Sequence, residues 1–554
     1  MITERKTKLT KRNMSTFGMY VLICTVLIGM MMTSGGCDSS PTKTKNGYTE
    51  ETGVITMITT SGSVSLKLLP LGDITIEWGD GNTSKGSRNQ GVIDFIHVYE
   101  NGIQHTITIL GNVSYLDSSN NGFTTILTSN NNALTLLNVS LNDLSTTALN
   151  DLFHSLNNRT AGKHIYIMGN PGALESDSSM AENKGWMVHG ENDSEAPAVT
   201  LKTSLSNVSF VIFAISDFIV DWGDGNKFTG YYNDRYEIRH TYKIQTTHTI
   251  SIYGKITQLG IGFRSLSDLN LSNASMLSGF GIVASDIGFL DISNNWLLES
   301  LGVPNNRLTS LDTSNNPLLR TLNVGNNRST GSYGFNQITK LDLRNNILLE
   351  SLDAFSNQLV EIDISNNSSL HSIRLDDNNL TSIDVTNKPL LASLIIGANR
   401  LTTIDLSNNP RLGFLNIGVN LLTSLDVSNN HLLYNLGAMR NQLSYLNLSN
   451  NPRLGLLLIR ENLLTTLDLS NNPHLWYLDI QSNQFSNFDA SNLINLERIY
   501  IQNNLFSSDS LNNLFHSLHD NQNITKSIFI SDNPGSDDSD KSIAEVKGWR
   551  VWNW

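Results

Sequence analysis

Apolar residues recur at a fixed step of 21 through the second half of this 554-residue chain. Each unit carries a short element of the form L-x-I/V/L-x-x-N. The first apolar residue of that element falls at Leu259, Phe280, Leu301, Leu322, Leu352, Ile373, Leu394, Leu415, Leu436, Leu457, Leu478 and Ile499. One step is 30 residues long, because the segment RSTGSYGFNQ (328–337) is inserted. Twelve registers with one interruption predict a stack of structural repeats.

Two short alternations within each unit predict one coil with a strand on each side. In ASLIIGAN, Leu394 and Ile396 point to one face while their neighbours point to the other, as a strand requires. In TTIDLSNN, Ile404 and Leu406 follow the same alternation, and a turn signal such as NNPRL separates the two segments. The inward aliphatic side chains are then buried only by the coils above and below, so we expect a solenoid.

A recurrent asparagine follows each L-x-I element. At a coil corner the backbone leaves amide and carbonyl groups unpaired, and an asparagine side chain offers both a donor and an acceptor. We therefore expect a buried stack formed by Asn378, Asn399, Asn420, Asn441, Asn462, Asn483 and Asn504. A second column carries one acid per coil, from Asp363 to Asp489, with Asn447 in its midst. A metal spine would need several carboxylates per turn, so we interpret this column as turn caps or solvated groups.

The chain also contains duplicated segments. Residues 150–188 closely match residues 512–551: each has an amphipathic helical stretch, a strand ending in Asn-Pro, and a second helix before Gly-Trp. We interpret each segment as a C-terminal cap that covers the last exposed coil. Trp186 and Trp549 are expected to close the open end of their stacks.

A second duplicated pair carries the tetrapeptide W-G-D-G. ITIEWGDGN (74–82) matches FIVDWGDGN (218–226), and residues 97–112 match residues 240–255. W-G-D-G is typical of a strand that enters a tight turn, where glycine tolerates positive φ.

The polar residues of these pairs have two interpretations. Asp80 and Asp224 have the chemistry of a calcium-binding or catalytic carboxylate, but a turn acceptor beside a core tryptophan is the simpler interpretation. His97 and His240 each precede a strand tyrosine, and we expect them in the core or at a sheet edge.

The repeat L-T-x-L-D-[LV]-S-N-N-x-x-L-x-x-L-x-I-x-x-N resembles leucine-rich repeats of the internalin J-like type, over roughly residues 255–534. The resemblance implies a curved solenoid whose L-x-I strands form a concave sheet, and it suggests an adhesive role; the internalin-type cap is absent. The W-G-D-G segments resemble PKD-like immunoglobulin-type sandwiches. The predicted fold class is mainly β: a leucine-rich-repeat solenoid with two small immunoglobulin/PKD-like β-sandwiches and short helical caps.

The first fifty residues differ in character. ERKTKLTKR (4–12) is positively charged, and GMYVLICTVLIGMMMT (18–33) is apolar but short for a membrane-spanning helix. With SGGC ending at Cys37, this order resembles a bacterial lipoprotein signal peptide, which implies cleavage before Cys37 and lipidation of that residue. Ser34 stands where that family has a larger apolar residue. Plain secretion and a retained helix are the alternatives.

The chain therefore contains the same order of predicted parts twice: a sandwich, coils and a cap. The first copy has few coils and the second has many. The predicted parts are 1–36 (lipoprotein signal peptide), 37–51 (tether), 52–112 (PKD-like sandwich 1), 113–190 (short leucine-rich-repeat segment with cap), 191–199 (linker), 200–255 (PKD-like sandwich 2), 256–511 (leucine-rich-repeat solenoid) and 512–554 (C-terminal cap).

The charge composition excludes some classes of binding partner. The net charge is −13, and removal of residues 1–36, with five Lys/Arg and one Glu, takes it to −13 − 4 = −17. No basic block exists outside the first dozen residues, so a nucleic-acid partner is not expected.

No Gly-rich phosphate loop, HExxH or G-x-S-x-G appears, so we expect no enzyme activity, catalytic residue, metal or cofactor. Of the two cysteines, Cys24 lies inside the apolar stretch that is expected to be removed, so the mature chain has no internal disulfide. We also expect a monomer.

Variable residues on the outer face of the L-x-I strands are free to carry specificity. Eight of them form an expected apolar and aromatic patch with two cations: Phe414, Met439, Leu456, Leu458, Arg460, Tyr477, Arg498 and Tyr500. This composition suits a protein-binding hot spot, although surface strands also carry aromatics for cross-strand packing.

The expected function is therefore that of an exported protein, lipid-anchored to the bacterial envelope, with outer-membrane and surface exposure. It would bind a protein or glycan partner through the concave face, as an adhesin does. Two alternatives remain open: a structural spacer without a ligand, and glycan capture by the sandwiches in a nutrient-uptake assembly.

Overall fold

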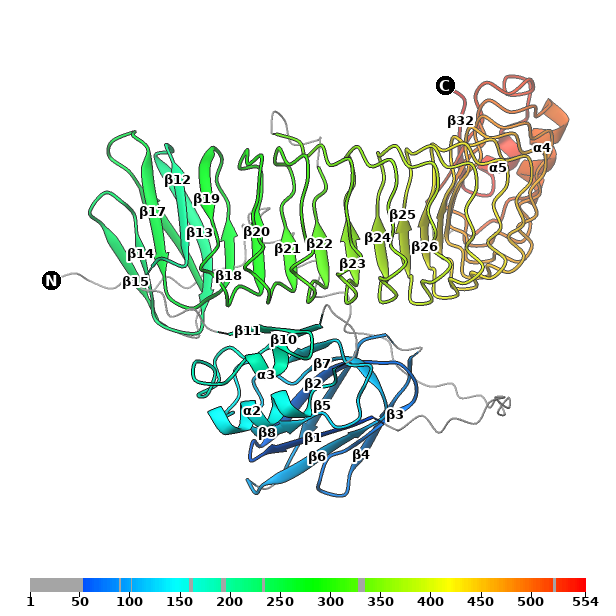
Figure 1. Ribbon diagram of the computed structural model, residues 1–554. Helices are drawn as coiled ribbons and strands as arrows, with labels where there is room; N and C mark the ends of the chain where they lie inside the picture. The colour runs from blue at the N-terminus through cyan, green and yellow to red at the C-terminus, as the bar shows by residue number, and fades with distance from the viewer. Residues whose placement is uncertain are drawn as a thin grey trace. The chain divides into compact units, whose positions relative to one another are not determined.

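The computed structural model describes residues 53–554 except 89–90, 101, 159–162, 191–195, 232–234, 327–333 and 522–524. This part of the chain is mainly β and contains the same arrangement of sheets twice (Figure 1). None of its helices is both long and apolar enough to cross a membrane.

The first copy has two sheets. Its strands are β1 (Val54–Thr59), β2 (Ser63–Pro70), β3 (Ile74–Glu77), β4 (Thr83–Gly86), β5 (Ile93–Val98), β6 (His105–Leu110), β7 (Val113–Asp117), β8 (Phe123–Leu127), β9 (Leu136–Asn138), β10 (Lys163–Tyr166) and β11 (Trp186–His189). One sheet has the order β4-β3-β6-β1-β8 and the other β11-β10-β9-β7-β2-β5. Leu66 of β2 and Ile76 of β3 belong to one buried cluster, so the two sheets share a core.

The second copy begins with the same two-sheet plan. Its first strands are β12 (Val199–Thr203), β13 (Asn207–Ala214), β14 (Phe218–Asp221), β15 (Lys227–Gly230), β16 (Arg235–Thr241), β17 (His248–Tyr253), β18 (Ile256–Ile261) and β19 (Leu266–Asn270). Strand β19 pairs with β12, as β8 pairs with β1. The first sheet of each copy therefore extends beyond the predicted sandwich ends at 112 and 255.

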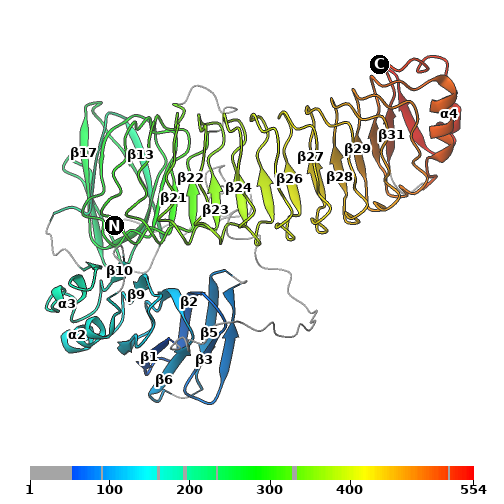
Figure 2. The ribbon, with the colours of Figure 1, turned by 45° about the vertical axis from the view of Figure 1, so that its right-hand side comes forward.

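The second sheet of this copy then continues as the solenoid. The further strands are β20 (Gly279–Ile282), β21 (Ser300–Gly302), β22 (Thr321–Asn323), β23 (Ser351–Asp353), β24 (Ser372–Arg374), β25 (Ser393–Ile395), β26 (Phe414–Asn416), β27 (Asn435–Gly437), β28 (Leu456–Leu458), β29 (Tyr477–Asp479), β30 (Arg498–Tyr500), β31 (Lys526–Phe529) and β32 (Trp549–Trp552). Figure 2 shows these short strands side by side along the stack. Together with β16, β13 and β18 they form one continuous sheet of 16 strands.

The predicted registers are confirmed. All twelve apolar positions lie on β18 and β20 to β30, and all are buried. Each pairs with its counterpart one coil away, as Leu394 does with Leu415 and Leu415 with Leu436. The protein is thus a leucine-rich-repeat solenoid in this region, with a core made of one aliphatic layer per coil.

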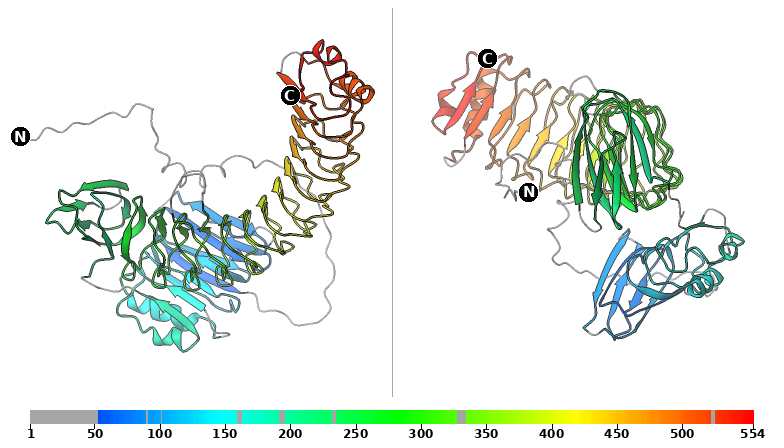
Figure 3. Two further views of the ribbon diagram at one scale, coloured as in Figure 1. Left: turned by 90° about the horizontal axis from the view of Figure 1, so that it is seen from above. Right: turned by 90° about the vertical axis from the view of Figure 1, so that its left-hand side faces the viewer.

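The predicted second strand is present only in the first coil, where β19 pairs with β12 of the sandwich. In the later coils the prediction is wrong: Leu406 is buried as expected, but the segment around Ile404 has no strand, and the described residues of those coils show on that side a single isolated bridge, between Asp342 and Asp363. The stack bends toward its strands (Figure 3, left), so the coils are spaced more widely on the opposite side. At that spacing, extended backbone keeps its in–out alternation but loses the hydrogen bonds between neighbours.

Both predicted caps contain two helices and a closing strand. The helices are α2 (Thr146–Ser155), α3 (Ser179–Glu182), α4 (Ser508–Ser517) and α5 (Ser542–Glu545). The side chains of Ser145 and Ser507 accept backbone N–H groups and so begin α2 and α4 as N-caps. Trp186 and Trp549 are buried, and the Nε1 of Trp549 donates to the carbonyl of His519 at 2.9 Å. Both tryptophans thus lie in the core at the last strand of their sheets.

The predicted asparagine stack is present and fully hydrogen-bonded. Asn420 shows the arrangement: its Oδ1 accepts the Leu401 N–H at 2.9 Å, and its Nδ2 donates to the carbonyls of Ile396 and Ile417. The carbonyl of Ile417 also accepts from Asn441 of the next coil. The side chains thus bond consecutive corners together. We call this column the first asparagine ladder.

A second asparagine ladder, which sequence reasoning missed, lies at the turn after the acidic column. Its members are Asn295, Asn316, Asn346, Asn367, Asn409, Asn430, Asn451 and Asn472, all buried. Each Nδ2 donates to two carbonyls of the preceding coil, as Asn451 does to Val427 and Asn430. The Oδ1 atoms are buried without a partner in all of them except Asn346. Thr313 lies in the coil before Asn346, at the position that Val427 has relative to Asn451. Its hydroxyl donates to the Oδ1 of Asn346 at 2.8 Å.

Val427→Thr is therefore expected to be tolerated in the core. A buried hydroxyl without a partner costs about 1–3 kcal/mol, whereas a threonine here has the unpaired Oδ1 of Asn451 as its acceptor. We expect the free energy of unfolding to stay within about 1 kcal/mol of the wild type, or to rise. Urea denaturation measures it. Val324→Thr, at a buried core position whose nearby Asn357 is satisfied, is the control. Equal losses in both variants would contradict the assignment.

Two residues after each position of the second asparagine ladder, an apolar side chain is also buried in the early coils. Met276, Leu297, Leu318 and Leu348 share one buried cluster with Tyr115, Leu136, Tyr166 and Met168 of the first copy. The ring of His189 lies 4.5 Å from that of Trp296. Beside the cluster, Arg320 forms a 2.5 Å ion pair with Glu350. Strands of the first copy thus pack against the early coils of the solenoid.

Candidate binding face

The candidate site is the strand-lined side of the solenoid. Figure 3, left, shows the coils bending so that the strands lie on the inner side. Strands β21 to β30 have three residues each; the middle one is buried, and the first and third face outward, half-buried in most coils. The strand therefore fixes two outward positions per coil. Their identities vary from coil to coil because they do not contribute to the core.

An aromatic row runs across the last coils of this face. Tyr477 and Tyr500 have ring centroids 5.3 Å apart. Tyr500 stacks on Phe529 at 4.4 Å with the planes 2° apart, and Phe529 lies 6.2 Å from Trp552. Sequence reasoning found the two tyrosines but missed Phe529 and Trp552. Continuing the L-x-I register into the cap, where Ile499 pairs with Ile528, would have found both.

The remaining apolar members of the predicted patch lie on the same face. Phe414, Leu456 and Leu458 occupy outward positions of β26 and β28 and are half-buried. Met439 lies beyond the end of β27, and its side chain covers Gly418, where an added Cβ would approach the Met439 Cγ to 2.9 Å. The structure therefore places the predicted apolar residues on one face of nearby coils. Met439 fills a space left by a glycine.

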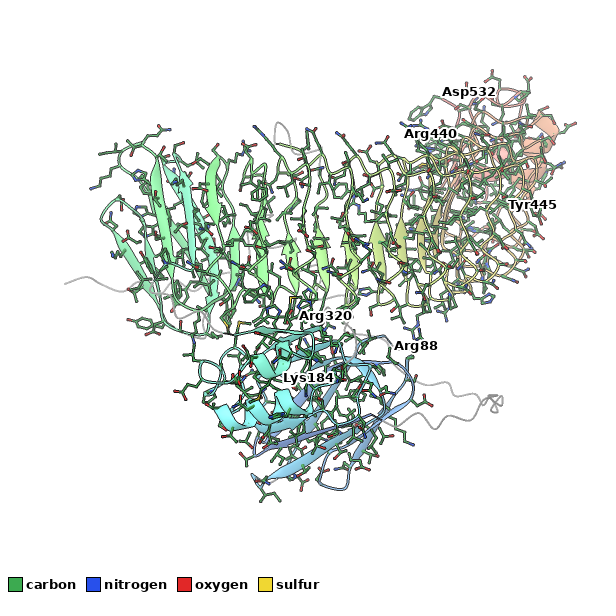
Figure 4. The ribbon with its side chains drawn as sticks, viewed as in Figure 1. Arg88, Lys184, Arg320, Arg440, Tyr445 and Asp532 are labelled. Carbon is green, nitrogen blue, oxygen red and sulfur yellow. The ribbon has the colours of Figure 1, made fainter. Side chains whose placement is uncertain are left out.

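The two predicted cations differ in their surroundings. Arg498 is exposed on the first position of β30. Arg460 instead lies 3.8 Å from the carboxylate of Asp479, whose side chain is only 6% exposed. Burial raises the pKa of Asp479. Glu461 pairs with Arg440, labelled in Figure 4, at 2.8 Å. Arg460 thus compensates a buried acid, and Arg498 is the predicted cation that is exposed to a ligand.

A charged cluster that sequence reasoning missed occupies the earlier coils of the face. The guanidinium of Arg374 lies 3.7 Å from the ring centroid of Phe355, and its Nε donates to Asp376 at 2.9 Å. Asp353 lies beside it, and burial raises the pKa of Asp353 to about 6. The face therefore has an aromatic end and a charged middle. These residues have no fixed pattern in the repeat, so only the three-dimensional arrangement shows that they meet.

The W-G-D-G residues form one arrangement in both copies. Asp80 Oδ1 accepts the Asn82 N–H, and its Oδ2 lies 2.7 Å from His97 Nε2, whose ring stacks on Trp78 at 4.7 Å. The interpretation of this aspartate as a turn acceptor beside a core tryptophan is confirmed.

Asp224 has the same contacts in the second copy. It accepts the Asn226 N–H, its Oδ2 lies 2.8 Å from His240, and the ring of His240 stacks on Trp222. Partial burial acts to raise the pKa of Asp224, but the hydrogen bonds from His240 and Asn226 outweigh it and hold the value at about 2.

The acidic column is also confirmed as a set of turn caps. Asp405 Oδ1 accepts the Ser407 N–H at 2.9 Å, and Asn447 accepts the Ser449 N–H in the same way. Predictions on residues 1–51, including the signal peptide, the tether and lipidation of Cys37, lie outside the described residues.

Comparisons with known proteins show similarity in structure only. No protein-family model matches the sequence, and no curated protein matches it. Among solved structures, the functional domain of InlJ from Listeria monocytogenes is 20% identical, covers 76% of this chain and 74% of its own, and has a TM-score of 0.42. An internalin, InlF, from Listeria monocytogenes is 22% identical over 54% of this chain and 86% of its own, with a TM-score of 0.48.

The leucine-rich-repeat protein LIC12759 of Leptospira interrogans is 17% identical, covers 74% of this chain and 95% of its own, and has a TM-score of 0.43. With scores below 0.5, these likenesses do not bear on what the chain binds. The coil architecture is established by the strand pairing described above.

Proposed function

We propose that this chain is a binding protein of the bacterial cell envelope that holds a protein or glycan partner on the concave face of its solenoid, as an adhesin does. The proposal includes export, lipidation at Cys37, display on the outer membrane and the predicted division into parts, with no enzymatic step. The mature chain acts as a monomer.

One observation carries the proposal. The aromatic row from Tyr477 to Trp552 runs over four neighbouring strands at ring distances of 4.4 to 6.2 Å, on a face whose other outward residues are mixed. Aromatic side chains bring large contact area at low conformational cost and are enriched in binding hot spots. The aliphatic core of each coil is already formed by the middle residue of the strand, so the row is not needed to complete that core.

Changing Tyr477 and Tyr500 together to Ser is expected to reduce attachment at least tenfold without a large loss of stability. Both side chains lie outside the aliphatic core, which the middle residues of their strands provide. Beads coated with residues 38–554 are tested for attachment to immobilised laminin, fibronectin and mucin. Thermal unfolding of each variant is followed in parallel.

Tyr445→Ser is the matched control for this experiment. Tyr445, labelled in Figure 4, is 69% exposed and lies on the same stack but not on its strands. Attachment that survives the double change would reject the concave face as the binding surface. Wild-type beads that attach to none of the surfaces would favour the spacer.

Exposure on intact cells separates the remaining alternatives. Digestion of residues 255–534 by added protease is expected for a surface adhesin, whereas protection would favour a periplasmic role. Glycan capture by the sandwiches predicts that an unrelated carrier displaying residues 53–127 is retained on polysaccharide columns; free elution would count against that alternative.

A further inference from the structure

Two exposed aromatic residues lie on the flank of the solenoid, next to the concave face. Tyr434 directly precedes β27 and is 54% exposed, and Trp476 directly precedes β29 and is 42% exposed. Neither belongs to the patch proposed above. Large apolar side chains in the same column of a solenoid, exposed to water, indicate a contact surface.

Each ring is seated on a glycine of the preceding coil. An added Cβ on Gly413 would approach Tyr434 Cε1 to 2.8 Å, and one on Gly455 would approach Trp476 Cδ1 to 3.2 Å. The backbones are also joined, because the N–H of Tyr434 donates to Gly413 and that of Trp476 donates to Gly455, both at 2.9 Å. Both rings are thus held by the same local geometry. Each keeps one side in contact with the coil and the other accessible.

The pair belongs to a larger repeat of two coils. PRLG at 410–413 recurs at 452–455, 42 residues later, and the aromatic residues recur with the same step. Arg411 and Arg453 recur with it, and both are exposed. With coils about 4.8 Å apart, each kind of residue returns about every 10 Å along the flank.

The flank carries two exposed arginines although the chain as a whole is acidic. Within the described residues neither Arg411 nor Arg453 forms an ion pair. The aspartates of these coils, such as Asp405, accept the backbone N–H two residues on in their own turn. In earlier coils the positions equivalent to Arg411 are Leu318 and Leu348, which are buried. The aromatic column ends at Glu497, one coil after Trp476.

We propose that this flank binds an extended acidic polysaccharide with a two-sugar repeat, laid along the stack. Sugar rings stack on Tyr434 and Trp476, because the apolar C–H face of a pyranose packs against an aromatic face. The carboxylate or sulfate of the alternate sugars pairs with Arg411 and Arg453, since guanidinium groups bind such anions in a bidentate manner. Two coils match the length of about one disaccharide in an extended β-linked chain. The site borders the concave face, since the ring of Trp476 lies 5.6 Å from that of Tyr477 and the ring of Tyr434 lies 6.4 Å from that of Phe414. Arg411 and Arg453 belong to this flank alone, so the arginine double variant separates this proposal from the one above.

Affinity electrophoresis of residues 38–554 in gels that contain chondroitin sulfate or hyaluronan tests this proposal. We expect retardation by at least one of them, and none by hydroxyethylcellulose, a neutral β-linked glucan. The variant Tyr434→Ala/Trp476→Ala and the variant Arg411→Gln/Arg453→Gln should each weaken binding at least tenfold. Trp476→Phe, which keeps an aromatic face, should retain most of it. Added salt should weaken binding, because exposed charges are screened.

Tyr445→Ala is the control for an exposed aromatic residue elsewhere on the stack and should bind as the wild type does. Circular dichroism and thermal unfolding check that each variant is folded. The proposal is overturned if neither acidic polysaccharide retards the wild type, or if the aromatic double variant binds equally well. Equal binding of the neutral glucan, or full binding by the arginine double variant, would overturn the acidic specificity.

Discussion

Asn420→Ala is expected to lower the free energy of unfolding of the solenoid by about 2–3 kcal/mol. The carbonyls that Asn420 contacts keep other partners, because Ile396 also accepts from Asn399 and Ile417 from Asn441. Among the described residues the Leu401 N–H has no other partner, so it is left buried without one, which costs about 1–3 kcal/mol. The cavity left by the amide adds to this loss. Urea denaturation gives the change in stability, and amide exchange at Leu401 locates it.

Asn430→Ala is the informative comparison. Asn430 is equally buried, but its Oδ1 is already unpaired, and the two carbonyls that it contacts also accept backbone N–H groups. The cavity is similar but no buried N–H loses its partner, so the loss is expected to be smaller than that of Asn420→Ala by about 1–2 kcal/mol. Asn408→Ala, an exposed residue beside it in sequence, should be neutral. Equal losses at 420 and 430 would mean that the two ladders do not differ in the way their hydrogen bonds indicate.

Lys388→Asn is expected to raise the free energy of unfolding by about 2 kcal/mol at pH 7. Lys388 occupies a position of the second asparagine ladder, is fully buried, and its Nζ donates to the Asn387 carbonyl at 3.2 Å. A buried ammonium with so few partners pays several kcal/mol of desolvation. Asparagine restores the pattern of its neighbours, in which the Nδ2 donates to two carbonyls of the preceding coil.

The effect should depend on pH. Burial lowers the pKa of Lys388 from its usual 10.5, although Asp384 and Asp363 act to raise it. The destabilisation is fully present while both folded and unfolded chains are protonated. It is relieved as the pH rises from the folded pKa toward 10.5, because only the folded chain releases its proton there. The advantage of Lys388→Asn over the wild type should therefore shrink in that window. Lys388→Met should show the same trend, and a gap that is constant with pH would contradict this account.

The core registers and the first asparagine ladder were predictable because both repeat at every coil. Leu394 and Asn399 each follow from a period of 21 and from one physical need, burial for leucine and hydrogen bonding for asparagine. The turn role of Asp405 followed from its place before a turn. In these positions local preference and the stacked structure agree.

Other features depend on distances that a single coil does not contain. The alternation at Ile404 is that of a strand, yet the bend of the stack separates neighbouring coils there. The second ladder was missed because its asparagine sits within the turn signal SNN, where an exposed residue is equally common. Phe529 and Trp552 belong to the cap, whose register becomes visible only once β31 is paired with β30. The pairing of Arg460 with Asp479 also joins residues of different coils.

The single sheet of 16 strands has a mechanical consequence. Its strands run across the long axis of the stack, and each coil hydrogen-bonds only to the coil before it and the coil after it. A tensile load along that axis would therefore act on one interface at a time and peel the coils away in sequence. Each released coil of 21 residues supplies up to about 70 Å of slack where it had occupied about 5 Å. Under tension, the protein would therefore lengthen in steps and dissipate the applied load.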